Sequence, residues 1–305
     1  MEGDDDGFCA PHRKDLYAET GSCLTRKELG QVAETYNEYH EENKIPKTVF
    51  ANKSELHGEL SKRFAEACTE EGEYCWLQNM PGSSKAVRQN LQENFKPLMP
   101  ASWYADRRTW LNTYDILYVM KQYERYHQHF KFLGVLSRDF MNTYGHDSSS
   151  CISKYMCKLD VNRSLVRKGR TEFGIVLNHD KHYESGSHWV AVFGSFDPRS
   201  PQYGIFYYDS VAKPPKPEVL AYLERMKAQF EGEEQKKPFS ISVNGRQHQF
   251  KNTECGMFAI NFLATCLDHP QKSYSAIMDM AMDDDDVNRL RSRFYSPNMR
   301  KTMTS

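Results

Sequence analysis

Residues 185–193, SGSHWVAVF, place a histidine and a tryptophan at the start of a run that otherwise has the composition of a buried strand. A titratable imidazole in such a run is either a histidine satisfied within the core or a catalytic base on a rigid mount. His188 alone does not distinguish these two interpretations. The rest of the chain has to decide between them.

Short runs rich in β-branched and aromatic residues surround this segment, separated by glycine, proline, serine and aspartate. They predict strands within residues 172–180, 187–196, 203–210 and 238–244. An amphipathic helix is expected over residues 214–230. Residues 255–269, CGMFAINFLATCLDH, are apolar nearly all round and predict a helix buried in the core. The fold class is therefore α+β.

The first part of the chain has a different pattern, with helices expected over residues 22–42 and 54–72. A segment rich in proline, glycine and serine, residues 79–90, is typical of a linker. We therefore predict a small helical N-terminal region over residues 1–80 and a second domain over residues 81–305. The helical pair weakly resembles the two-helix SAP-type modules that bind DNA. Its mixed charge favours a pair packed on the main domain, or a spacer.

Composition excludes few partners. The 305 residues include 40 basic and 41 acidic ones, so the net charge of −1 demands neither nucleic acid nor membrane. No apolar run is long enough for a transmembrane helix, and the polar, acidic N-terminus lacks the order of a signal peptide. The eight cysteines show no framework pattern, so we expect free thiols in a reducing compartment.

Two groups of residues could suggest a metal. Cys151 and Cys157 with His146 have no common zinc spacing, and the aspartates of MDDDDVNRLRSRFYSP, residues 282–297, suit a helix start followed by basic residues. We therefore predict no metal site and no cofactor.

Two other residues could form a catalytic group with His188. Asp209 ends a predicted strand, and Cys255 begins the predicted buried helix. A nucleophilic cysteine reacts as its thiolate, which a helix N-terminus and a neighbouring imidazolium both favour. A carboxylate bonded to the other ring nitrogen fixes the histidine. Cys266, in the same helix, is expected to be an inert buried thiol.

Donors for a tetrahedral oxyanion can also be named. The backbone N–H of Cys255 is one candidate, and the side chain of Gln249, with Asn252 as the fallback, is the second. Gly256 is expected to remove a side chain where substrate backbone must approach.

These motifs together carry a resemblance. The ordered segments GSHWVAVF, FYYDS and QFKNTECG resemble those of cysteine proteases of the SUMO-deconjugating and adenovirus-protease kind, and WLNTYDI, residues 110–116, resembles the segment that opens their catalytic domain. VLNHD, HWVAVF, YYDS and NTECG are most similar to the polyprotein-processing proteases of large DNA viruses, of the African swine fever virus type. The resemblance covers about residues 94–295.

The resemblance implies a papain-like catalytic domain with a mixed central sheet. It implies Cys255 as nucleophile, His188 as base and acid, Asp209 as orienting group and Gln249 as oxyanion donor. Trp110 and Trp189 would clamp a narrow channel that admits only glycine, so that cleavage follows Gly-Gly. The swine-fever-type enzymes have asparagine where this chain has Asp209.

Three hypotheses follow. The first is a thiol endopeptidase that matures viral core polyproteins at Gly-Gly-Xaa sites, in the host cytoplasm at the viral factory and in the virion, with no membrane partner. Its N-terminal helices would contact the virion core or nucleic acid. The second is a deconjugase that releases SUMO-like modifiers. The third is a non-catalytic binding module with a protease-like fold, against which the full set of site residues argues.

Overall fold

The computed structural model describes residues 8–68, 72–80, 85–143, 151–231, 237–280 and 282–296. The chain forms two compact units, one of Met1–Pro100 with Ser292–Ser305 and the other of Ala101–Arg291. None of the helices in the described residues combines the length and the hydropathy that crossing a membrane requires.

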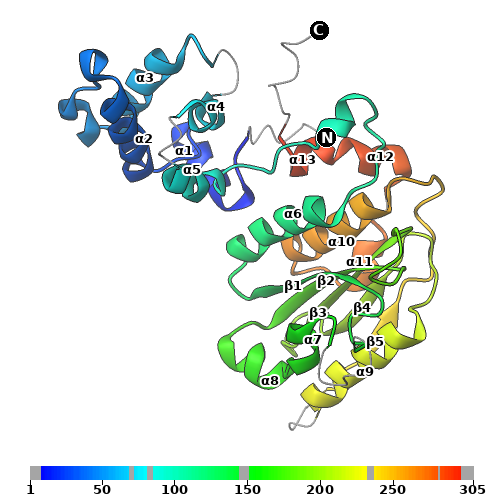
Figure 1. The fold of residues 1–305 in the computed structure, drawn as a ribbon. Coiled ribbons are helices and arrows are strands. Elements are labelled where there is room, and N and C mark those ends of the chain that lie inside the picture. Colours follow the sequence, from blue (N-terminus) through cyan, green and yellow to red (C-terminus); the bar gives the residue numbers. More distant parts are fainter. Residues whose placement is uncertain are drawn as a thin grey trace. The chain divides into compact units, whose positions relative to one another are not determined.

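The first unit is helical (Figure 1). Its helices are α1 (Lys14–Thr20), α2 (Arg26–Tyr39), α3 (Lys53–Phe64), α4 (Gly72–Asn79) and α5 (Lys85–Gln92). Thr25 and Glu28 form a capping box at the start of α2, and Asn52 caps α3. The apolar faces of these helices share one core, which includes Leu29, Val32, Leu56, Leu60, Trp76, Leu91 and Phe95.

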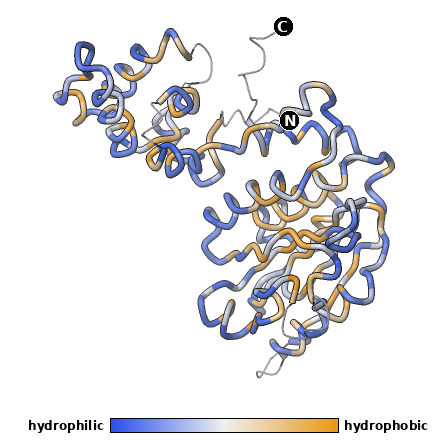
Figure 2. The backbone as a smooth tube through the Cα atoms, in the orientation of Figure 1, coloured by the Kyte–Doolittle hydropathy of each residue, from blue (hydrophilic) through white to orange (hydrophobic). Residues whose placement is uncertain are grey.

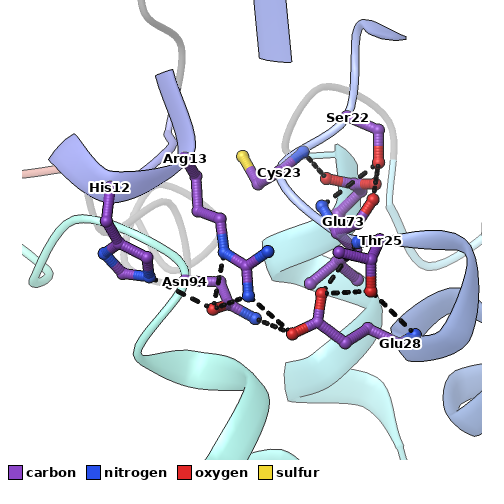
Figure 3. A network of polar contacts seen from close by, with 9 residues as sticks. His12, Arg13, Ser22, Cys23, Thr25, Glu28, Glu73 and Asn94 are labelled. Atoms are coloured by element: carbon purple, nitrogen blue, oxygen red, sulfur yellow. Dashed lines mark hydrogen bonds and ion pairs between the residues drawn. The ribbon is translucent and has the colours of Figure 1, made fainter. Parts of the chain in front are cut away.

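The units do not divide at the predicted boundary between residues 80 and 81. Leu91 and Phe95 are buried in the N-terminal core. Figure 3 shows why the chain near them is held there: the Arg13 guanidinium donates to Asn94 at 2.8 Å and to Glu28 at 2.6 Å, and the Asn94 amide donates to Glu28 at 3.1 Å. Residues 85–90 of the segment expected to be a linker are therefore part of α5, and Asn94, just beyond that helix, is bonded to Arg13 and Glu28.

The second unit has one five-stranded sheet of order β1-β2-β3-β4-β5. Its strands are β1 (Phe130–Ser137), β2 (Glu172–Asn178), β3 (Trp189–Ser195), β4 (Gly204–Tyr208) and β5 (Ile241–Val243). β1 and β2 are parallel, β3 is antiparallel to both β2 and β4, and β4 and β5 are parallel. The sheet is therefore mixed, as predicted.

Helices cover both faces of this sheet (Figure 1). The helices of this unit are α6 (Thr113–Tyr126), α7 (Lys154–Lys158), α8 (Val161–Ser164), α9 (Pro217–Glu231), α10 (Cys255–Asp268), α11 (Tyr274–Met278) and α12 (Asp284–Arg289). A further helix, α13 (Arg291–Phe294), begins at the last residue of this unit and continues into the first. On one face, side chains of β2, β3 and β4 pack with Leu223 and Met226 of α9. On the other, α10 packs against β3. Figure 2 shows hydrophobic residues gathered along the strands and α10.

The sequence prediction missed one strand, β1. It follows directly on the apolar pattern of α6, and its ladder with β2 shifts register between Phe132 and Gly134. Gly134 has a φ of 130°, which other residues rarely adopt. The sequence of this irregular strand therefore lacks the regular alternation of apolar and polar residues from which a strand is predicted.

Six cysteines are paired in the structure: Cys9 with Cys23, Cys68 with Cys75, and Cys151 with Cys157. The expectation of free thiols is therefore wrong for these six. Local folding brings the Cα atoms of each pair to 5.3, 5.7 and 6.6 Å, which is bridging distance. Cys255 and Cys266 are free and buried.

A carboxyl group is buried beside the first disulfide. Glu73 accepts hydrogen bonds from the Ser22 hydroxyl and, at 2.7 Å, from the Cys23 N–H (Figure 3), and the His57 ring lies 3.5 Å away. Burial raises the pKa of Glu73 from its usual 4.5 to about 7, although these hydrogen bonds oppose the rise. The folded state therefore binds a proton more tightly than the unfolded chain does.

This raised pKa predicts that the free energy of unfolding falls as the pH rises from about 4.5 through 7, where the folded state gives up the proton. The contribution of Glu73 is on the order of 3 kcal/mol, an upper bound. Urea unfolding of the wild type and Glu73→Gln at pH 5, 6, 7 and 8 measures it, because the variant lacks the titrating group and should lose this slope. Equal slopes in both proteins would contradict the prediction.

Candidate active site

The predicted histidine and aspartate meet at one edge of the sheet. His188 directly precedes β3 and Asp209 directly follows β4. Because these strands are antiparallel, with Ala191 opposite Tyr208, the start of one lies beside the end of the other. The His188 Nε2 and the Asp209 Oδ1 are 2.7 Å apart, a hydrogen bond.

Asp209 is completely buried and is held by its backbone as well as its side chain. Its Oδ1 also accepts from the Val211 N–H at 2.9 Å. The Asn244 side chain accepts from the Asp209 N–H at 2.8 Å and donates to the Asp209 carbonyl at 2.7 Å. Asn244 was not predicted. Its only signal in the sequence is its position directly after a strand.

Cys255 completes the group. It is the first residue of α10 and is buried, and its thiol is near enough to the His188 ring to act on the pKa of that ring. Burial alone would lower the pKa of His188, but the hydrogen bond to Asp209 and the neighbouring Cys255 thiol raise it to about 9. The imidazole is thus protonated at neutral pH, and its positive charge lies beside the sulfur at the start of the helix.

The other free cysteine contrasts with Cys255. Cys266 lies in the same helix and is fully buried, and this burial raises the pKa of its thiol well above the usual value. It therefore stays protonated, as expected of an inert buried thiol.

The two predicted amide donors lie in different environments. Gln249 is buried: its side-chain oxygen accepts from the Ser210 hydroxyl at 2.6 Å, and its amide nitrogen donates to the Lys251 carbonyl at 2.8 Å. Asn252 is exposed. The structure therefore fixes the orientation of Gln249, while Asn252 faces solvent.

The tryptophan segment packs on the start of α10. The buried Trp189 indole donates to the Leu111 carbonyl at 2.9 Å, and Trp110, the preceding residue, is 44% exposed. A Cβ on Gly256 would lie 3.0 Å from the Leu111 Cβ. The missing side chain of Gly256 therefore makes room for Leu111, a role that the sequence did not suggest.

In the described residues, one group of side chains has the composition and spacing of possible metal ligands. His179, His188 and Asp209 are the group whose donor atoms lie together, all within 4.8 Å. Since His188 Nε2 is bonded to Asp209, we assign this group to the histidine–aspartate pair. Cys151 and Cys157 are bonded to each other, and His146 lies outside the described residues.

The aspartates of residues 283–286 have structural partners. Asp283 caps α12, with Asp286 as its capping-box partner. Asp284 is buried and accepts from the backbone N–H groups of Phe250 and Lys251, at 2.9 and 3.2 Å. This segment thus anchors the loop that carries Gln249, a role that the sequence did not suggest.

Comparison with known proteins gives homologues. The chain is 23% identical over 300 residues to R355 of Acanthamoeba polyphaga mimivirus, which is named as a thiol protease, and the match covers 94% of this chain and 93% of that protein. It is 29% identical over 135 residues, 44% of this chain, to the SUMO-1 cysteine protease S273R of African swine fever virus, of which 48% is covered. No family model matches.

The chain is a homologue of these viral thiol proteases, and it is a thiol protease itself. The crystal structure of the African swine fever virus pS273R protease has the same fold: it superposes with a TM-score of 0.62 at 19% identity and covers 96% of this chain and 97% of that one. The predicted fold class is therefore confirmed.

The contact between Gly256 and Leu111 predicts the effect of Gly256→Ala. The added methyl group must displace Leu111, whose carbonyl holds Trp189. Because small displacements in a catalytic site are costly, turnover should fall about 10- to 100-fold. Peptide cleavage and the rate of Cys255 alkylation measure the effect.

Gly245→Ala is the matched control, since a Cβ there meets nothing within 4 Å. Equal activity of the two variants would show that the Leu111 contact does not position the site.

Proposed function

We propose that this thiol protease cleaves peptide bonds with Cys255 as nucleophile, His188 as general base and acid, and Asp209 as the group that orients His188. The supporting observation is that the buried Asp209 is hydrogen-bonded to His188, whose pKa is raised by Asp209 and by the Cys255 thiol at the start of α10. Each group has the partner that its task requires.

The reaction follows from this geometry. The Cys255 sulfur attacks the scissile carbonyl carbon, and the carbonyl oxygen becomes an oxyanion. The backbone N–H of Cys255 and a side-chain amide, Gln249 or Asn252, would stabilise this charge. His188 then gives its proton to the leaving amine as the C–N bond breaks. Water, deprotonated by His188, releases the acyl group from sulfur and regenerates the thiol.

For the substrate, we propose cleavage after Gly-Gly within viral core or structural polyproteins, during virion assembly. Trp189 is fixed against the segment that carries the exposed Trp110, beside the first turn of α10. Two indole faces at this place would admit backbone without a side chain. The likeness to the swine fever virus protease extends over nearly the whole chain, including the helical unit.

Partners and location are proposed with this function. The enzyme would act in the host cytoplasm, at the viral factory, and in the virion. Its helical unit would contact the virion core or nucleic acid. A reducing compartment would keep the Cys255 thiol available for reaction.

A second candidate is release of a SUMO-like modifier from its target. It is favoured by the name of the swine fever virus relative, a SUMO-1 cysteine protease. Both candidates use the same catalytic groups and differ in the protein that is recognised.

The catalytic assignment predicts a ranking of variants. Cys255→Ala and His188→Ala should each abolish turnover, because members of a catalytic unit fail together. Asp209→Asn should cost less, since an amide can still orient the ring. Initial rates of peptide cleavage test this, with circular dichroism as the control for folding. Residual turnover in Cys255→Ala equal to the wild type would exclude this nucleophile.

The substrate proposal predicts that peptides containing Gly-Gly-Xaa are cleaved after the second glycine. The same peptides with Gly-Ala should be cleaved at least about 100-fold more slowly, because the added Cβ meets the indoles. Sequencing the new N-termini identifies the cut. Incubation with a SUMO conjugate in parallel separates the two candidates. Equal cleavage of both peptides would rule out the glycine channel.

A further inference from the structure

One oxygen of the catalytic carboxylate has no obvious function. Asp209 Oδ1 accepts from His188 and from Val211. Within the described residues, Oδ2 is buried without a hydrogen-bond partner. A buried carboxylate oxygen without a donor is costly, because no hydrogen bond replaces the water that it has lost. The ionisable group that the structure places beside this oxygen is His179, whose Nε2 lies 3.8 Å away.

His179 is itself held from three sides. Its backbone N–H donates to the His188 carbonyl at 2.8 Å, just beyond the ladder of β2 and β3. Its Nε2 lies 3.1 Å from the hydroxyl of Tyr207, which precedes Asp209 by two residues on β4. Its ring meets the His188 ring edge to face, with centroids 4.9 Å apart. The side chain therefore links the end of β2 to both members of the catalytic pair.

His179 and His188 differ in charge at neutral pH. Burial, and next the positive charge of His188, lower the pKa of His179 to about 4, although Asp209 opposes this. Lys216 and Lys213 are the other charged groups that act on it. His179 is therefore neutral when His188 is protonated. It can lie against the carboxylate without competing for its charge.

We propose that His179 is a positioning residue: its ring, held by the hydrogen bond between Nε2 and the Tyr207 hydroxyl, lies against Oδ2 and shields the Asp209 carboxylate from water, so that Asp209 keeps His188 directed at Cys255. The proposal rests on the catalytic roles proposed above. It adds a fourth side chain that acts through Asp209 and touches neither substrate nor sulfur.

Three variants of the full-length protein test this role. His179→Phe keeps a ring but removes the nitrogen, and His179→Gln keeps a side-chain nitrogen without the ring. His182→Phe is the matched control, because His182 also pairs with an aspartate, Asp139, at 2.8 Å, and lies in the same connection between β2 and β3. The first measurement is the rate of Cys255 alkylation by iodoacetamide from pH 5 to 10, with the labelled residue identified by mass spectrometry. It needs no knowledge of the substrate.

In the wild type, we expect a plateau that ends where His188 loses its proton. His179→Phe should move this alkaline limit downward by about one pH unit, because a misdirected carboxylate holds the imidazolium less well. Peptide cleavage should show kcat about tenfold lower with KM within about twofold. His179→Gln should recover part of both effects, and His182→Phe should match the wild type.

Several outcomes would overturn the proposal. The first is a folded His179→Phe whose alkylation profile coincides with the wild type. The second is an equal shift in His182→Phe, which would show a general effect of the loop. If His179→Phe does not fold, a wild-type profile in His179→Gln, together with unchanged kcat, also overturns it. A wild type whose Cys255 is not the labelled residue refutes the catalytic assignment instead, which is a separate failure.

Discussion

The hydrogen bond between His188 and Asp209 is made where the carboxylate has no exposed surface. A charge can be kept in such a place only if donors replace the water that it has lost. The antiparallel pairing of β3 and β4 brings the two side chains together, and Asn244 holds the backbone of Asp209 on both sides. The arrangement of the sheet is therefore a condition for the chemistry.

The position of His188 also explains the position of α10. The imidazole lies just before β3, so the helix that carries the sulfur has to begin beside the ends of the inner strands β3 and β4. Its body packs against β3, and its second residue is a glycine in contact with Leu111. That contact joins the helix start to the Trp189 indole through a single carbonyl. The nucleophile and the proposed substrate clamp are thus parts of one packed structure.

The sequence allowed the main features to be predicted because they lie at marked boundaries. His188, Asp209 and Cys255 stand where strands or helices begin or end, and composition locates those ends. Asn244, His179 and Leu111 could not be found in this way. Their roles depend on neighbours that are distant in sequence, and nothing local distinguishes them from ordinary residues of loops and strand ends.

Two further features could not be predicted for a related reason. They are the boundary of the helical unit and the pairing of the cysteines. The segment expected to be a linker has linker composition, yet Asn94 just beyond it completes a network with Arg13 and Glu28. Cysteine spacing likewise does not show which Cα atoms folding brings within bridging distance. In both cases the deciding contact exists only in the folded chain.

The disulfides and the catalytic thiol of this protein require opposite redox conditions. Three bridges are present in the structure, and the two remaining thiols are those of α10. An oxidant that preserves the bridges also threatens the thiolate, and a reductant that protects the thiolate can open the bridges. Purification with and without dithiothreitol should therefore yield two preparations of one polypeptide. Their activities cannot be compared until the thiol count of each is known.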